Sequence, residues 1–184
     1  AGKPAEILLK TNNLSDFKII KKLYEASEAG VKIRLIVRGM FSLLPQVQNM
    51  STNIEAIGIV DKYLEHSRLF VFGNGGKKKY FLSSSDWMTR NIDRRVEVTC
   101  PIYCERIQKE IDEYLEIQWR DSVKARILDK SLENTYRRSH NGHLPVRAQE
   151  AIYQLLDRQN EVETKREMQR QNSLEQQQDV AEVA

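Results

Sequence analysis

A strand, a helix and a second strand follow one another near the start of the sequence, and this order constrains the fold more than any other feature. Glu6–Thr11 has the apolar composition of a buried strand, and the spacing after it predicts a helix from about Asp16 to Ala29, ended by Gly30. Val31–Val37 is the second strand. Strands joined through a helix pair in parallel by a right-handed crossover. The pattern therefore predicts an α/β fold.

Further short apolar segments add strands to this sheet. Ile54–Val60 is a third strand, and Leu69–Phe72 and Lys79–Leu82 form a hairpin joined by an Asn-Gly-Gly turn. Arg94–Thr99 is predicted as one more strand. After Pro101 the apolar residues recur at helical spacing. The expected core positions of that helix are Ile107, Ile111, Tyr114, Leu115 and Trp119.

The carboxyl-terminal part of the chain is polar. Residues 122–136 are a charged connection, and Pro145 stands where a helix start favours proline. Beyond Arg158 the apolar stripe thins while Gln and Glu multiply. We therefore expect one domain over residues 1–157 and a helical or disordered tail over 158–184, with residues 172–184 disordered.

Composition limits the classes of partner. The chain of 184 residues has a net charge of +3, too small to imply nucleic acid by itself. From Lys62 to Arg95, however, eight basic residues face three acidic ones, which indicates an anionic ligand. No apolar run reaches the roughly 18 residues of a membrane span, and no signal peptide begins the chain, so a soluble protein is expected. Cys100 and Cys104 fit packing thiols in a reducing cytoplasm.

His66 is the first candidate for chemistry. It precedes an apolar strand, and Arg68 follows two residues later, so an extended backbone places both side chains on one face. A neutral imidazole, with an ordinary pKa of about 6.5, can attack phosphorus or transfer a proton near neutral pH. The pair is suited to a phosphoryl group, although a lone histidine at a strand start also fits a structural role.

Arg38 is the second candidate. With Gly39 it follows a parallel strand at its carboxyl end, where open α/β sheets bind ligands, and the glycine permits a close backbone approach. A surface arginine in a loop is the alternative. The glycines and lysines of residues 73–79 join two strands and so do not form a nucleotide P-loop. His140 and His143 have no carboxylate or thiol at ligand spacing, which favours solvated loop histidines over a metal pair.

Together these segments resemble the C-terminal catalytic domain of the polyphosphate kinase family, a relative of the phospholipase D superfamily. The resemblance spans about Gly2 to Leu156 and excludes the Gln-rich end. It implies a phospholipase D-like mixed sheet flanked by helices, with a C-terminal helical extension. The segments that carry it are Lys10–Leu14, Leu23–Val31, Leu35–Met40, Ser51–Ile54, Tyr63–Arg68, Ser84–Asn91 and Arg95–Val98.

The resemblance implies an ATP:polyphosphate phosphotransferase that works reversibly through a phosphohistidine. His66 corresponds to the family's second active-site histidine, which contacts the nucleotide phosphates and is proposed to act as an acid or base. Arg38 corresponds to an arginine that binds ATP phosphate, and Arg68 is also expected to bind phosphate. A polyphosphate chain is expected to be guided by basic side chains, for which a solvated surface is the alternative at the lysines. These side chains are Lys77, Lys78, Lys79, Arg90 and Arg94.

The sequence also departs from the superfamily. Its phospholipase D-type motif is degenerate, because Arg68 replaces a lysine and Gly73 stands where an aspartate is expected, which counts against a hydrolase. Only one of two histidine-bearing halves is present. The phosphorylated histidine and the Mg²⁺ ligands are therefore expected in preceding domains, no metal ligand is expected in this chain, and the chain alone is expected to be an inactive fragment.

The expected partners are ATP, ADP, inorganic polyphosphate and the N-terminal domains of the parent protein, which is expected to form a homo-oligomer in the cytoplasm or at a membrane. Nucleic acid is not expected. Two alternatives stay open: a phospholipase D-like phosphodiesterase or nuclease completed by homodimerisation, and a module that binds ATP or polyphosphate without turnover.

Overall fold

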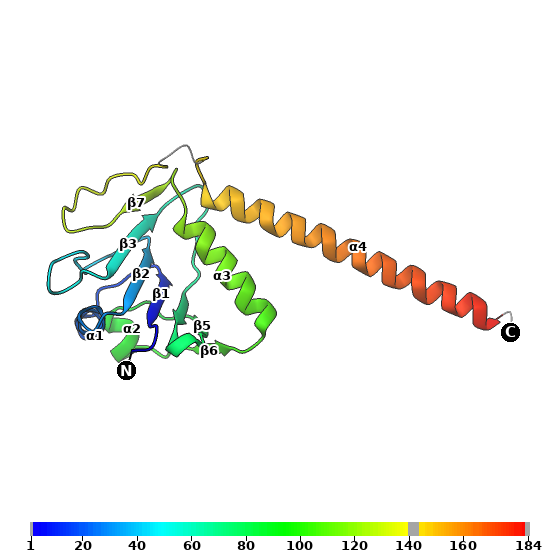
Figure 1. Ribbon diagram of the computed structural model, residues 1–184, viewed down its shortest axis with the longest axis horizontal. Coiled ribbons are helices and arrows are strands. Elements are labelled where there is room, and N and C mark those ends of the chain that lie inside the picture. The colour runs from blue at the N-terminus through cyan, green and yellow to red at the C-terminus, as the bar shows by residue number, and fades with distance from the viewer. Residues whose placement is uncertain (1, 140–143, 183–184) are drawn as a thin grey trace. The chain divides into compact units, whose positions relative to one another are not determined.

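The computed structural model describes residues 2–139 and 144–182 (Figure 1). Its elements in chain order are β1 (Glu6–Thr11), α1 (Phe17–Glu28), β2 (Lys32–Val37), β3 (Ile54–Ile59), β4 (Leu69–Phe72), the 3-10 turn η1 (Asn74–Gly76), β5 (Lys79–Ser83), α2 (Thr89–Arg94), β6 (Thr99–Ile102), α3 (Glu105–Trp119), β7 (Ala125–Ile127) and α4 (Ala148–Glu182).

All seven of these strands form one mixed sheet in the order β6-β5-β4-β1-β2-β3-β7. β1, β2 and β3 are parallel, which confirms the strand-helix-strand unit predicted from the sequence. β4, β5 and β6 continue one side of the sheet in antiparallel pairs, and β7 pairs antiparallel with β3 on the other side. The predicted hairpin is therefore β4 and β5.

The sheet is covered on both faces, because successive residues of its central strands enter different clusters. Leu8 packs with α3 residues such as Leu115, whereas Leu9 packs with α1 residues such as Leu23. Leu9 and Leu115 are fully buried. Burial on both sides explains the consecutive apolar residues of these strands, Ile7–Leu9 in β1 and Leu35–Val37 in β2.

The strand predicted over residues 94–99 is wrong in its position. Residues 89–94 form α2, and β6 begins only at Thr99. Val96 and Val98, which alternate with a glutamate, are 99% and 60% exposed. Pro101 is tolerated within β6 because this strand pairs only with β5 and so lies at the edge of the sheet.

The charged connection contains β7, which the sequence did not indicate. A buried aspartate organises its start: Asp121 Oδ1 accepts hydrogen bonds from the backbone N–H of Val123, Lys124 and Ala125 at 2.7–3.0 Å. Asp121 Oδ2 accepts from Ala148 N at 2.7 Å. One carboxylate therefore fixes both the short strand and the first residue of α4.

α4 is one helix to Glu182, where the sequence predicted disorder from residue 172. Residues 1–148 make one compact unit and residues 149–184 a second. His140 and His143 lie outside the described residues. Cys100 and Cys104 are exposed, so the expectation of packing thiols is wrong. Within the described ranges, no helix combines the length and the apolarity needed to cross a membrane.

Candidate functional site

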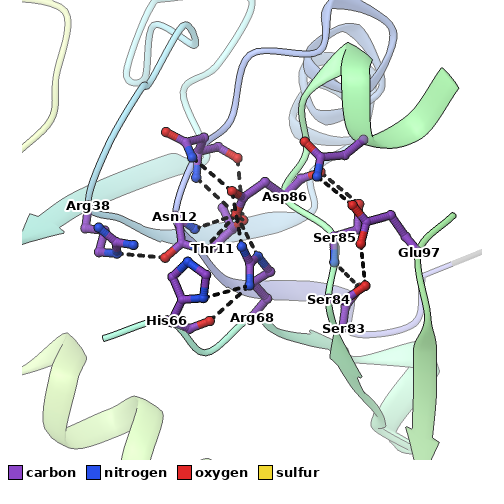
Figure 2. Close-up of polar contacts among 12 residues, drawn as sticks. Thr11, Asn12, Arg38, His66, Arg68, Ser83, Ser84, Ser85, Asp86 and Glu97 are labelled. Atoms are coloured by element: carbon purple, nitrogen blue, oxygen red, sulfur yellow. Dashed lines mark hydrogen bonds and ion pairs between the residues drawn. The ribbon is translucent and has the colours of Figure 1, made fainter. Parts of the chain in front are cut away.

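Four chain segments bring polar side chains to one edge of the sheet, by which we mean the row of strand ends where β1 and β2 finish (Figure 2). β1 and β2 are parallel and end at this edge with Thr11 and Val37. β4 runs antiparallel to β1 and β5 antiparallel to β4, so β4 begins and β5 ends at the same edge. Arg38, Arg68 and Asp86 therefore meet although they are far apart in the sequence.

Asp86 is the centre of this cluster and is 5% exposed. Its Oδ1 accepts from the Thr11 hydroxyl at 2.9 Å and from both the backbone and side-chain nitrogens of Asn12 at 3.0 Å. The same oxygen accepts from Arg68 Nε at 2.9 Å, and Oδ2 lies 3.5 Å from Arg68 Nη2. Asn13 Nδ2 donates to Oδ2 at 2.9 Å. The carboxylate therefore joins β1 to the segments that flank β4 and β5.

These donors keep Asp86 ionised. Burial alone would raise the pKa of this carboxyl, but the hydrogen bonds from Arg68, Asn13, Asn12 and Thr11 outweigh burial and hold the pKa well below its usual range. The Arg68 side chain is 13% exposed in this ion pair. Asp86 therefore supplies the negative charge that fixes the guanidinium of Arg68 beside His66.

Asn12 connects this cluster to Arg38. Its side-chain oxygen accepts from Arg38 Nε at 2.7 Å while its Nδ2 donates to Asp86. Gly39 makes the approach possible, because a Cβ at this position would lie 2.6 Å from Asn13 Oδ1 and 2.9 Å from the Asn12 carbonyl oxygen. The backbone at Gly39 therefore closely approaches the end of β1, and its approach to a phosphate stays a prediction.

His66 lies beside Arg68 and is exposed. Arg68 Nη1 donates to the His66 carbonyl oxygen at 3.1 Å and lies 3.5 Å from His66 Nδ1 (Figure 2). The predicted placement of both side chains on one face is thus confirmed. If Nδ1 accepts this N–H, the proton of the ring lies on Nε2. His66 then presents an N–H donor at its outer nitrogen.

Two groups at this edge have no protein partner among the described residues: the terminal guanidinium nitrogens of Arg38 and Nε2 of His66. Arg38 also lines a cavity of about 370 Å³ between the ends of β2, β3 and β7. Figure 2 shows both side chains at the same edge of the sheet. Arg68, by contrast, donates from Nε to Asp86 and from Nη1 to the His66 carbonyl oxygen.

The other predicted basic residues are divided between two places. Arg90 and Arg94 are exposed on α2, which begins three residues after Asp86. The exposed Lys77–Lys79 follow the β4–β5 turn at the opposite end of these strands, where Gly73 N donates to the Glu6 carbonyl oxygen at 2.8 Å. The structure therefore does not bring the lysines together with Arg38.

The carboxylate of Asp86 is poorly suited to bind Mg²⁺. Hard cations need free oxygen ligands, and the oxygens of Asp86 already accept from several donors. Among residues 2–139 and 144–182, no group of three or more His, Cys, Asp or Glu side chains is arranged to hold a metal ion.

Sequence reasoning missed Asp86 and Asn12 as members of the site. Both occur in segments that carry the family resemblance, but neither had an assigned role. A usable signal was available: consecutive polar residues directly after a buried strand, as in Thr11–Asn13, mark a polar strand end. Their partner Asp86, 73 to 75 positions away, could not be identified from one sequence.

The mixed sheet with helices on both faces defines an α/β domain, and its likeness in fold to a phospholipase D family member confirms the predicted fold class. The chain superposes on Nuc, a phospholipase D family member from Salmonella typhimurium, with a TM-score of 0.55 over 70% of this chain and 84% of that one. At 12% identity this likeness concerns the fold alone.

The chain belongs to the family described as polyphosphate kinase C-terminal domain 2, which matches residues 1–149. It is 53% identical over 156 residues to the polyphosphate kinase of Vibrio cholerae and 51% identical over 152 residues to that of Escherichia coli. These stretches cover 85% and 83% of this chain. The crystal structure of polyphosphate kinase from Porphyromonas gingivalis matches with a TM-score of 0.84 at 48% identity, covering 88% of this chain and 24% of that one. The chain spans 22% of the length of the two curated relatives.

Proposed function

We propose that this chain is one domain of an ATP:polyphosphate phosphotransferase, in which it binds the phosphates of ATP and supplies one active-site histidine. The phosphorylated histidine belongs to a preceding domain of the parent protein. The family membership and the names of the relatives support the reaction, and the geometry of the sheet edge supports the assignment of residues.

One observation carries the assignment of the site. Asn12 holds Arg38 through its oxygen and Asp86 through its nitrogen, and Asp86 in turn holds Arg68 against His66. The uncommitted nitrogens of Arg38 and His66 are thereby fixed at one edge. Such fixed donors stabilise charge on a phosphoryl group without further rearrangement.

Each side chain has a distinct role in the transfer. The bond between the terminal phosphorus and the ADP oxygen breaks as a phosphorus–nitrogen bond forms to the preceding domain's histidine. The phosphoryl group then passes from that nitrogen to the terminal oxygen of polyphosphate. Arg38 neutralises charge on the phosphate oxygens, and His66 Nε2–H donates to an oxygen of the group in transfer. Arg68 acts by holding the His66 ring.

Several consequences follow for the parent protein. Its Mg²⁺ ligands lie outside this chain, and it acts as a homo-oligomer in the cytoplasm or at its membrane. The 184-residue chain alone binds ATP or polyphosphate without turnover. It is also inactive on a chromogenic phosphodiester in the presence of a metal chelator, the assay that would reveal a phospholipase D-like hydrolase.

The test uses the full-length parent enzyme with His66→Ala, Arg38→Ala and the control Arg106→Ala, whose exposed guanidinium pairs only weakly with Glu110 at 3.3 Å. We expect His66→Ala to lower kcat for polyphosphate synthesis by about 10²-fold or more. Arg38→Ala should lower kcat/KM for ATP by about 10²-fold. Arg106→Ala should change neither constant. Wild-type synthesis by both site variants would refute the proposed function.

A further inference from the structure

The residues on either side of His66 point into the protein rather than toward the site. Glu65 Oε2 accepts from Lys10 Nζ at 2.8 Å and from the Tyr114 hydroxyl at 3.0 Å. Ser67 Oγ lies 3.0 Å from the same Tyr114 hydroxyl. The side chains therefore alternate in direction along this segment. His66 faces the edge of the sheet where Arg68 lies, and both of its neighbours face α3.

Three parts of the fold meet in these contacts. Lys10 comes from β1, Tyr114 from α3, and Glu65 and Ser67 from a segment, residues 61–68, that is neither helix nor strand. Gln118 Nε2, one turn further along α3, donates to the Tyr114 oxygen at 3.1 Å and also to Glu65 Oε2. Because no regular element surrounds His66, these side-chain contacts fix the path of its backbone.

The ion pair within this group is largely removed from water. The Lys10 and Glu65 side chains are 6% and 17% exposed, and Lys10 Nζ also lies 5.8 Å from the centre of the Tyr114 ring. A buried pair of this kind is costly to form and costly to break, and its best-attested use is to specify one geometry. Lys10 is held by Glu65 and has little exposed surface, so it is poorly placed to bind phosphate itself.

We propose that Lys10, Glu65 and Tyr114 form a positioning clamp that sets the His66 ring for phosphoryl transfer. The proposal rests on the function proposed for His66 and extends it to residues that touch no substrate. Tyr114 is the central member, because its hydroxyl contacts the residues before and after His66 at once. Its removal should shift the ring without removing any group that contacts ATP.

Tyr80 of β5 offers a matched control, because its hydroxyl also bonds to a side chain of α3. The hydroxyl of Tyr80, a residue that is 5% exposed, donates to Asp112 of α3 at 2.8 Å. Tyr80 lies next to the β4–β5 turn, at the end of the sheet away from His66. Tyr80→Phe and Tyr114→Phe each delete one hydroxyl that is bonded to a carboxylate, so a general loss of stability should affect both variants alike.

The experiment measures kcat, KM for ATP and the thermal midpoint in the full-length parent enzyme carrying Tyr114→Phe or Tyr80→Phe. We expect Tyr114→Phe to lower kcat by about tenfold, because a displacement well under 1 Å misaligns the reacting groups. KM for ATP should change by less than about twofold, since Arg38 is untouched. Tyr80→Phe should leave kcat at the wild-type value.

A double variant separates the clamp from the proposed function. If Tyr114 acts through His66, adding Tyr114→Phe to His66→Ala should lower kcat no further. An unchanged kcat in Tyr114→Phe, an equal loss in Tyr80→Phe, or a multiplicative loss in the double variant would overturn the clamp while leaving the role of His66 intact. Full activity of His66→Ala would instead remove the role proposed for His66 and the clamp with it.

Discussion

Arg38 donates its Nε to the side-chain oxygen of Asn12 at 2.7 Å, and this bond connects the end of β2 to the end of β1. The amide of Asn12 is polar at both ends, so it satisfies a cation on one side and a carboxylate, Asp86, on the other. An aspartate or a leucine at this position could not do both. The guanidinium of Arg38 is thus oriented by the same network that orients Arg68.

This bridge gives the first prediction. Asn12→Ala should leave the terminal nitrogens of Arg38 intact but free to move. ATP should therefore bind to the full-length parent about five- to tenfold more weakly, a loss of about 1 kcal/mol, the size of one net hydrogen bond. Calorimetric titration with ATP measures the change. Asn53→Ala is the control, because the Asn53 amide donates to the Ser27 carbonyl oxygen at 2.8 Å, near the amino end of β3 and away from the site. Equal weakening by both variants would argue against the bridge.

How far the sequence predicts this protein depends on the range of each interaction. The strand-helix-strand unit and the β4–β5 hairpin follow from local patterns, because apolar runs and turn residues act within a few positions. The common face of His66 and Arg68 is also local. The position of Arg38 follows from the rule that open α/β sheets bind ligands at the carboxyl ends of their parallel strands. His66 and Arg68 lie at the same edge because β4 runs antiparallel to β1, a pairing that the sequence did not indicate.

The remainder depends on partners that are distant in the sequence. Asp86 has its role only because β5 ends at the same edge of the sheet as β1, and Tyr114 has its role only because α3 packs against residues 61–68. Neither residue differs in type from many surface aspartates or core tyrosines. β7 was missed for a related reason: its three residues are placed by pairing with β3 and by Asp121 rather than by their own composition.

The ionised state of Asp86 predicts a pH-dependent stability. Asp86→Asn should lower the free energy of unfolding of the 184-residue chain by about 3 kcal/mol at pH 7, because Arg68 loses its buried counter-charge. The pKa of Asp86 is lowered in the folded state, so its stabilisation is complete above the unfolded pKa of about 3.9 and is lost as the pH falls below that value toward the lowered pKa.

Urea unfolding of both proteins from pH 7 down to pH 3 measures this linkage. The difference in the free energy of unfolding between wild type and Asp86→Asn should be constant near neutral pH and should become smaller below about pH 4. Asp129→Asn is a suitable comparison, because Asp129 also has a lowered pKa but bonds mainly to Ser131 in an exposed loop. A difference for Asp86→Asn that grows on acidification would contradict the predicted charge state.

The separation of the basic residues predicts a dependence on chain length. Lys77–Lys79 lie at the far end of the β4–β5 hairpin, about 15 Å from the site edge at roughly 3.4 Å per residue. Replacing all three by glutamine should weaken retention of long polyphosphate by the parent enzyme and reduce its sensitivity to salt, while tripolyphosphate binds as before. The double variant Arg90→Gln/Arg94→Gln should weaken the binding of long polyphosphate and of tripolyphosphate alike. Unchanged retention of long chains by the lysine variant would remove their guiding role.

Gly73 gives the last prediction, because it occupies the position where the superfamily motif has an aspartate. Its backbone lies so close to β1 that a Cβ would sit 2.9 Å from both the backbone nitrogen and Cγ of Glu6. Gly73→Asp should therefore destabilise the chain by about 2 kcal/mol through overpacking and should not create a hydrolase. Gly73→Ala separates the effect of size from that of charge. Equal losses of unfolding free energy in Gly73→Ala and Gly73→Asp, measured in urea, would place the cost at the Cβ. A loss confined to Gly73→Asp would show that the carboxylate, and not the close approach of β1 to the β4–β5 turn, excludes aspartate here.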